Sequence, residues 1–198
     1  MWETCSGLSK STLTGERLYL RPLASRDAEA LLRLVSENRE FFAQREAAVR
    51  GEGYFTVDGQ LERIQEVVQM EASGRGVNLG IFLHAGDELI GHLALFGILR
   101  GGFQEARIGY MLAERHSGQG YATEAVNLAV AYAFGELDLH RLETGVQLDN
   151  PASARVLSKA GFREEGMSLH WVQIAEAWED CLRFGLTKGE WEEPALPG

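Results

Sequence analysis

Two glycines, Gly118 and Gly120, lie immediately before a helix-like run in the stretch RHSGQGYATEA, residues 115–125. Glycine costs about 1 kcal/mol relative to alanine inside a helix, so the pair needs a local reason. One reason is structural, because a tight strand-to-helix turn often requires a positive φ. The other is chemical, because a bare backbone lets a phosphate approach the unpaired N–H groups of a helix entrance. Arg115 would add a full positive charge there, and Gln119 a further hydrogen-bond donor.

The spacing around these glycines excludes two common phosphate-binding motifs. No Gly-Lys-Ser or Gly-Lys-Thr follows them, so the stretch is not a P-loop. A dinucleotide-binding G-x-G-x-x-G motif would need its third glycine where Thr123 stands. On this segment alone, a structural turn and a phosphate site both remain open.

A second group of polar residues lies in NPASARVLSKAGF, residues 150–162. Pro151 and Gly161 predict a helix that begins at the proline and ends before the glycine. Asn150 is the expected N-cap, whose side chain accepts a hydrogen bond from the backbone two or three residues on. Ser153 is either a first-turn residue of this helix or a hydroxyl that can move a proton.

Composition limits the class of protein. The chain has 198 residues, 45% of them hydrophobic, which fits one globular domain. A net charge of −10 argues against a nucleic-acid partner, since such binding depends on clustered lysine and arginine. No apolar run approaches the roughly 18 residues of a membrane span, and no signal-peptide pattern begins the chain. Cys5 and Cys181 make no metal-ligand spacing, so we expect a cytoplasmic protein without a metal site.

Hydrophobic periodicity predicts the elements that must position these groups. The β-α-β crossover through residues 107–148 requires a parallel strand pair, whereas the hairpins around it are antiparallel. The sequence therefore predicts one mixed α/β domain at 15–191, between tails at 1–14 and 192–198. Strands are expected at 16–23, 77–84, 89–99, 107–113, 140–148, 162–174 and 179–188, and helices at 25–37, 58–73, 121–137 and 151–160.

Together these motifs resemble the GNAT superfamily of N-acetyltransferases, which carries Arg/Gln-x-x-Gly-x-Gly/Ala at this place. Here the pattern is Arg115, Gly118 and Gly120. The segments GYATEA, N..S...L.K.GF..EG and ED…F.LTKGEW are similar to the RimJ/RimL-like branch, which modifies N-terminal amines of ribosomal proteins. The resemblance covers residues 16–191, and its motifs are more specific for the family than for the acceptor.

The resemblance implies a fold and a cofactor. The fold would be a GNAT-like mixed, mostly antiparallel sheet of about six to seven strands, with helices on both faces and a splayed parallel pair. Acetyl-CoA would bind with its pyrophosphate at the glycine loop and its pantetheine arm in the splay, and coenzyme A would be the product. The implied cofactor-binding residues are Tyr110, Met111, Leu112, Arg115, Ser117, Gly118, Gln119, Gly120, Tyr121, Ala122, Asn150 and Ser153.

The resemblance also implies catalytic roles. A serine at the place of Ser153 is proposed to protonate the leaving thiolate, and the absence of tyrosine from 154–160 favours that serine here. Some members of the branch have a glutamate base where this chain has Val172. His170 is our substitute for the base, because its ordinary pKa of about 6.5 suits the task. Gln173, Glu176, His92 and Glu143 are weaker candidates, and a partly neutral amine would need no strong base.

The acceptor is less well defined by the sequence. In this fold the segment 39–56 faces the acceptor, so Phe41, Phe42, Tyr54 and Phe55 either form an apolar wall or cover the core. Trp171 and Trp178 either line the acceptor slot or pack at an edge. We expect a protein N-terminal amine; the alternatives are a small amine, such as a polyamine, an antibiotic or an amino-acid derivative, and a non-catalytic CoA-binding module. Either a monomer or a homodimer is compatible with the sequence.

Overall fold

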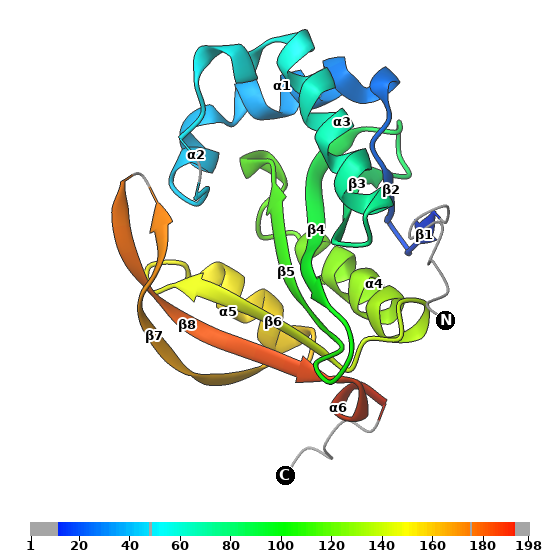
Figure 1. Ribbon diagram of the computed structural model, residues 1–198. Coiled ribbons are helices and arrows are strands. Elements are labelled where there is room, and N and C mark those ends of the chain that lie inside the picture. The colour runs from blue at the N-terminus through cyan, green and yellow to red at the C-terminus, as the bar shows by residue number, and fades with distance from the viewer. Residues whose placement is uncertain (1–11, 48, 175, 193–198) are drawn as a thin grey trace.

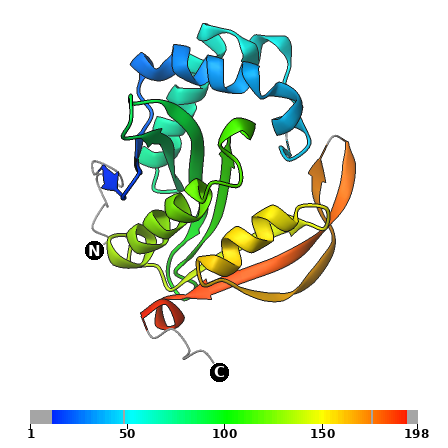
Figure 2. The same ribbon diagram turned by 180° about the vertical axis from the view of Figure 1, so that it is seen from behind.

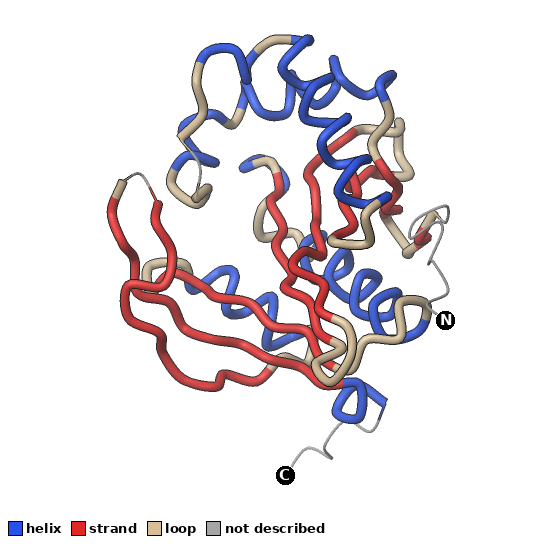
Figure 3. The backbone as a smooth tube through the Cα atoms, viewed as in Figure 1, coloured by secondary structure: helices blue, strands red, loops and turns tan. Residues whose placement is uncertain are grey.

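The computed structural model describes residues 12–47, 49–174 and 176–192, so most of both expected tails lies outside the described residues. One sheet of eight strands runs through the molecule in the order β1-β2-β3-β4-β5-β6-β8-β7 (Figures 1 and 3). Its strands are β1 Leu13–Thr14, β2 Leu18–Pro22, β3 Gly76–Leu83, β4 Leu89–Leu99, β5 Glu105–Leu112, β6 Arg141–Gln147, β7 Arg163–Ile174 and β8 Ala177–Thr187. The predicted mixed sheet is confirmed, with eight strands instead of six to seven. The extra strand is β1, two residues within the stretch expected as a tail.

Helices cover both faces of the sheet. They are α1 Ala28–Glu37, α2 Arg39–Ala43, α3 Val57–Ala72, α4 Tyr121–Gly135, α5 Pro151–Lys159 and α6 Lys188–Glu192, with 3-10 turns η1 Ser25–Asp27, η2 Glu52–Phe55 and η3 Glu114–His116. Seen from behind, α4 and α5 lie on one face (Figure 2). Val126, Val130 and Phe134 of α4 are buried in the larger apolar core. Helices α1 and α3 pack on the other face, where Leu31 and Ile64 are buried against the second core.

Strands β5 and β6 are the parallel pair, and they part after three residues. Pairing runs from Glu105–Arg141 to Arg107–Glu143 and then stops. Beyond this point β5 stays paired with β4 as far as Leu112, and β6 stays paired with β8 as far as Gln147. The two strands therefore diverge into a fork (Figure 1), and among the described residues no strand pairs with the inner main chain of 108–112 on that side.

Three short helical segments, α2, η2 and α6, were not predicted. The region 39–56 was ambiguous in the sequence because glycines interrupt it, and it contains α2 and η2. Helix α6 begins after Thr187, whose hydroxyl and N–H group both bond the carboxylate of Glu190. This T-K-G-E run is a capping box, and it is a signal that the sequence offered.

One ion pair fixes the start of α1 against the sheet. Asp27 is 6% exposed, and its carboxylate bonds both terminal nitrogens of Arg21 at 2.7 Å. The Arg21 guanidinium also lies 4.0 Å above the ring of Phe82. Burial acts to raise the pKa of Asp27, but the Arg21 guanidinium and the hydrogen bond from the Ala24 N–H group together outweigh it, so that pKa lies below its ordinary value.

Replacing Asp27 with alanine should lower the free energy of unfolding by about 3 kcal/mol, because a part-buried guanidinium then loses its partner. Urea denaturation at pH 7 measures the effect, and Glu29→Ala, on the exposed side of α1, should change it by no more than about 0.5 kcal/mol. Since the folded-state pKa of Asp27 is depressed, the stabilisation is complete above about pH 4 and fades as the pH falls through that pKa. An equal loss in both variants would contradict the assignment.

Candidate functional site

The glycine loop connects β5 to α4 in a conformation that suits glycine. Gly118 has φ +74° and Gly120 has φ +85°, the left-handed region that other residues rarely adopt. Gly120 is the N-cap of α4, and the first bond of the helix runs from the Glu124 N–H group to its carbonyl at 3.1 Å. A β-carbon at Gly118 would meet nothing within 4 Å. The structural reason for the glycines therefore holds, and the open helix entrance also allows an anion to approach.

Arg17, which the sequence did not single out, lies at this entrance. Its guanidinium donates to the Gln119 carbonyl at 2.9 Å and to the Glu124 carboxylate at 2.9 Å. A β-carbon on Gly120 would lie 3.2 Å from an Arg17 nitrogen. The guanidinium also stacks on the ring of Tyr121, 4.7 Å from its centroid. The side chain is 45% exposed, so a positive charge is held at the loop and still reaches solvent.

Arg115 is oriented differently from the sequence expectation. Its guanidinium forms ion pairs with Glu37, at the end of α1, at 2.6 Å, and with Glu88, in the β3–β4 turn. Its carbonyl accepts a hydrogen bond from the side chain of Gln119 at 2.8 Å. Arg115 therefore anchors the loop, and its direct contact with a ligand stays a prediction. Ser117 ends η3, and Ala122 packs on the larger core.

A hollow of about 500 Å³ lies beside the same helix entrance. Arg17 and Gly120 form one part of its lining, and Thr123 and Asn127 of α4 another. Lys159, at the end of α5, adds a second cationic side chain. Two carboxylates, Glu16 and Glu124, also line the hollow, and Glu124 is the ion-pair partner of Arg17. The hollow therefore places two cationic side chains, two carboxylates and several hydrogen-bonding groups next to the glycine loop.

A tyrosine and a serine meet on the α4–α5 side of the fork. The hydroxyl of Tyr110, on β5, lies 2.9 Å from the Ser153 hydroxyl and 3.3 Å from the Ser153 carbonyl. Burial raises the pKa of Tyr110 to about 12, although the bond to Ser153 acts against the rise. Tyr110 therefore remains protonated at neutral pH. No tyrosine lies in the helical segment 154–160. In the structure Tyr110, on strand β5, brings a tyrosine hydroxyl to Ser153 instead.

Ser153 is held in place by the cap of α5. Its N–H group donates to the Asn150 side chain at 3.2 Å, which confirms Asn150 as the N-cap. Gly161, with φ +89°, follows the helix as predicted. The cap fixes the first turn of α5, so the Ser153 hydroxyl has a defined position opposite β5.

The opposite side of the fork is lined by Trp171. A β-carbon on Gly145 of β6 would lie 2.3 Å from the Trp171 ring, so only glycine permits this contact. Arg183 stacks on the other part of the indole at 4.3 Å. Arg107 also lies over the indole, and pairs with Glu143 at 3.1 Å at the last rung before the fork. Trp171 is thus packed beside the fork. The Glu143 carboxylate forms ion pairs with both Arg107 and Arg183.

The α2 region spans the two ends of the fork. The side chain of Asn38, just before α2, accepts from the Glu114 N–H group at 2.8 Å, immediately after β5. Arg45, just after α2, pairs with Asp149 at 2.6 Å and lies 3.3 Å from the Gln147 side chain, at the end of β6. The segment predicted to face the acceptor is therefore tied to both strands of the fork.

The histidine candidates lie in different environments. His170 is on β7 with φ +48°, is 77% exposed, and lies 3.7 Å from Asp180. Its role as a base stays a prediction. His92 is a residue of β4 whose side chain lies on the α1–α3 side of the sheet. There a terminal nitrogen of Arg63 lies 3.3 Å from its Nε2 atom. Burial and the nearby Arg63 and Arg50 lower the pKa of His92 to about 3, so it is neutral and a poor base.

Neither a metal cluster nor a membrane helix is found in the described parts of the chain. No group of three or more His, Cys, Asp or Glu side chains there could hold a metal ion. None of the helices there is long and apolar enough to cross a membrane. Cys181 is buried, as expected for a small hydrophobic side chain, and Cys5 lies outside the described residues.

Comparison with known proteins identifies the family. Residues 17–163 match the model of the acetyltransferase (GNAT) domain. The chain is 48% identical to "Probable N-acetyltransferase YjcK" of Bacillus subtilis over 168 residues, 85% of this chain and 92% of that protein. It is 28% identical to the ribosomal protein uS5-alanine N-acetyltransferase of Escherichia coli, over 94% and 95% of the two chains. The crystal structure of Mycobacterium smegmatis RimJ with CoA-disulfide superposes with a TM-score of 0.84 at 28% identity, covering 90% of this chain and 84% of that one.

The chain therefore belongs to the GNAT acetyltransferase family and is an acetyl-CoA-dependent N-acetyltransferase. The described residues fit this cofactor. The open surroundings of Gly118 leave room for a phosphate at the helix entrance, and the fork leaves inner main-chain groups of β5 free to bond an amide-containing arm. Arg17 and Lys159 supply charges that are complementary to phosphate.

Glutamate at Gly118 or Gly120 should reduce acetyl-CoA affinity more than tenfold, because a carboxylate would occupy the entrance and repel the phosphates. Calorimetric titration with acetyl-CoA measures the effect. Gly101→Glu is a matched control, since Gly101 has φ +73°, open surroundings and a place in another turn. Loss of stability in all three variants, with normal affinity in the loop variants, would restrict the glycines to a structural role.

Arg17→Gln should weaken acetyl-CoA binding by about five- to tenfold, as expected for loss of a charged contact that is partly exposed. The same titration, repeated at rising salt concentration, separates charge from shape: the difference between wild type and variant should shrink as salt screens the guanidinium. An Arg115→Gln variant tests the sequence expectation in parallel. If only the Arg115 variant loses affinity, Arg17 is a structural residue.

Proposed function

We propose that this N-acetyltransferase acetylates the N-terminal amine of a protein, with ribosomal proteins as the acceptor class. Support comes from the relatives along nearly the whole chain, which include an enzyme named for alanine of ribosomal protein uS5. The single observation that carries the proposed chemistry is the Tyr110–Ser153 contact in the fork between β5 and β6.

The chain binds and orients both reactants. When bound, acetyl-CoA supplies an acetyl group that is already activated as a thioester, so positioning accounts for much of the catalysis. The N–H groups at the entrance of α4 and the Arg17 guanidinium hold the phosphates. Inner main-chain groups of β5, at Tyr110, Met111 and Leu112, align the arm through the fork.

Ser153 and Tyr110 provide the proton for the leaving group. As the bond between the amine nitrogen and the acetyl carbon forms, the carbon–sulfur bond breaks and the sulfur must receive a proton. The Ser153 hydroxyl donates it, and the Tyr110 hydroxyl, held protonated by its high pKa, donates a hydrogen bond to the serine oxygen as that proton leaves. The proton that the amine loses to the base returns to Ser153 through solvent, which restores the hydroxyl for the next turnover. The amine gives up its own proton to a base, for which His170, beside Asp180, is our candidate.

Two other functions would use the same fold. A small amine could replace the protein N-terminus, and a shorter match, over 44% of this chain, is to a spermidine N(1)-acetyltransferase of Vibrio cholerae. A non-catalytic CoA-binding module would keep the glycine loop without needing a hydroxyl pair. The Tyr110–Ser153 contact supports an enzyme, because a hydroxyl pair beside the fork can supply a proton that a binding module does not need.

A panel of acceptors tests the proposal. The protein is incubated with acetyl-CoA and, separately, with N-terminal peptides of ribosomal proteins, spermidine, an aminoglycoside and free amino acids, while free thiol is followed. Peptide acetylation at the α-amine, located by mass spectrometry, is the expected result. Turnover on small amines alone would show that the acceptor is a small amine and not a protein N-terminus. Binding of acetyl-CoA without turnover on any acceptor would show that the protein is a CoA-binding module.

Ser153→Ala should lower kcat about 10- to 1000-fold on the best acceptor, the range of general-acid catalysis, with acetyl-CoA affinity nearly unchanged. Tyr110→Phe should lower kcat less, by about three- to tenfold, because it removes only a supporting hydrogen bond. Since Tyr110 has a pKa of about 12, the rate should show no decline from its ionisation between pH 7 and 10.

Ser158→Ala is the matched control, because Ser158 is an exposed serine of the same helix whose hydroxyl bonds only the Ala154 carbonyl. Its kcat should equal that of the wild type. A normal kcat in Ser153→Ala would remove this residue from the mechanism and leave a water molecule to deliver the proton.

A further inference from the structure

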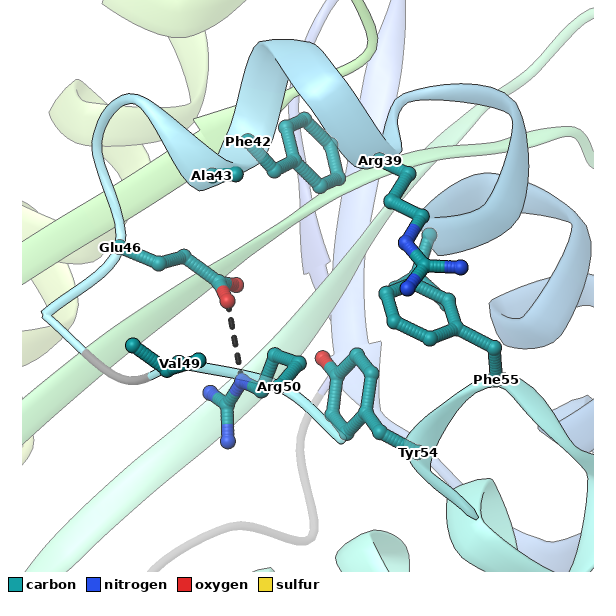
Figure 4. A pocket seen from close by; sticks show the side chains of 9 residues that line it. Arg39, Phe42, Ala43, Glu46, Val49, Arg50, Tyr54 and Phe55 are labelled. Atoms are coloured by element: carbon teal, nitrogen blue, oxygen red, sulfur yellow. Dashed lines mark hydrogen bonds and ion pairs between the residues drawn. The ribbon is translucent and has the colours of Figure 1, made fainter. Parts of the chain in front are cut away.

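A pocket of about 210 Å³ lies within the segment 39–56, whose aromatic residues the sequence left as either an apolar wall or a cover of the core (Figure 4). Helix α2 forms one wall, and Val49 and Arg50, which precede η2, close the other side. Phe42, Tyr54 and Phe55 give it an aromatic lining, and Ala43 leaves it wide enough for a large side chain. We call it the Tyr54 pocket.

The Tyr54 pocket lies close to the fork. Its α2 wall is tied to the end of β5 by the Asn38–Glu114 bond and to the end of β6 by the Arg45–Asp149 ion pair. Met111, on the outer end of β5, packs on the same apolar cluster as Phe42 and Tyr54. A molecule whose amine enters the fork from this face would have its neighbouring groups beside the pocket.

The Tyr54 hydroxyl is a buried group that lacks a partner. Its oxygen is inaccessible and meets no hydrogen-bond partner among the described residues. Burial raises the pKa of this phenol, although the nearby guanidinium groups of Arg63 and Arg50 act to lower it, so it remains a donor. In Figure 4 the hydroxyl is directed toward the space between Arg50 and Phe42. A buried donor left unpaired is costly, so a ligand that carries an acceptor such as a carbonyl is favoured there.

The charges around the Tyr54 pocket oppose a cation. Arg39 is paired with Glu52 and Arg50 with Glu46, so these four charges balance. Behind the lining, the Arg63 guanidinium lies 5.6 Å from the centre of the Tyr54 ring and contacts His92 at 3.3 Å, and no ion pair joins it to a carboxylate in the described part of the chain. The surroundings are thus net positive in a chain of net charge −10. A lysine side chain or a polyamine would therefore be repelled where an uncharged apolar group is accepted.

We propose that the Tyr54 pocket selects the acceptor by an uncharged, apolar side chain within its first two residues, and that the Tyr54 hydroxyl donates a hydrogen bond to a nearby peptide carbonyl. This inference rests on the proposed function and specifies which N-termini are modified. The acceptor class that follows is a peptide whose beginning is apolar, with polyamines excluded.

Two series of pentapeptides test this specificity, one with Ala, Leu, Phe, Lys or Glu at the first position and one with the same residues at the second. In the series whose side chain reaches the pocket, Leu and Phe should exceed Lys and Glu in kcat/KM by about tenfold or more. Spermidine should be a poorer acceptor than any apolar peptide. Equal kcat/KM values across both series would overturn the proposal while leaving the N-terminal acetyltransferase activity intact.

Variants of the pocket supply the second test. Ala43→Phe fills the Tyr54 pocket, so it should raise KM for the Leu and Phe peptides about tenfold and leave that for the Ala peptide nearly unchanged. Ala47→Phe, an exposed residue of the same loop that does not line the pocket, is the matched control and should change neither value. Tyr54→Phe keeps the ring and should raise peptide KM about three- to tenfold, with kcat and the KM for acetyl-CoA unaltered.

The outcomes separate the two proposals. A uniform rise in KM for all peptides in Ala43→Phe, or no effect of either pocket variant, would show that acceptor side chains do not enter. A complete absence of thiol release with every peptide would instead contradict the proposed function. Normal melting temperatures of Ala43→Phe and Tyr54→Phe exclude misfolding, and a peptide preference that vanishes in Ala43→Phe alone supports the pocket.

Discussion

The end of pairing between β5 and β6 is the constraint on which the rest of the structure depends. The last rung joins Arg107 to Glu143 in the ladder, and their side chains form an ion pair there as well. Beyond it, the Trp171 ring packs against β6 at Gly145. Any larger residue at position 145 would clash with this ring. The outer edges of both strands remain bonded to β4 and β8, so the fork is held open without loss of the sheet. Tyr110 is then placed along β5, and the glycine loop and the cap of α5 follow the ends of the two strands.

The glycine loop depends on a contact from the opposite end of the chain. Glu124, in the first turn of α4, accepts from the Arg17 and Leu18 N–H groups and pairs with the Arg17 guanidinium. Burial acts to raise the pKa of Glu124, but these donors outweigh it and the pKa lies below its ordinary value. The carboxylate therefore stays charged near neutral pH and orients Arg17 toward Gly120. The Glu124 carboxylate, in the first turn of α4, thus holds the Arg17 guanidinium at the start of the same helix.

Local signals in the sequence were sufficient for part of this site. The glycines before α4 and the Asn-Pro start and glycine end of α5 follow from rules that act over four or five residues, and both elements formed where these rules predicted. The Tyr110–Ser153 contact joins residues 43 positions apart, and Arg17 meets Glu124 across 107 positions, so no local pattern could disclose either. The Tyr54 pocket is built from short helices with weak periodicity, whose position is decided by Asn38 and Arg45.

Alternation along β5 explains why the two proposed functions of the site lie on opposite faces. Successive side chains of a strand point to opposite sides, and Tyr110 packs with the α4–α5 core whereas Met111 packs with the α1–α3 core. A hydroxyl that protonates the leaving group therefore lies on one side, and the Tyr54 pocket on the other. In a continuous sheet, hydrogen-bonded backbone would separate the two faces. The fork removes this barrier at one place, so a thioester held within it can be reached from both faces at once.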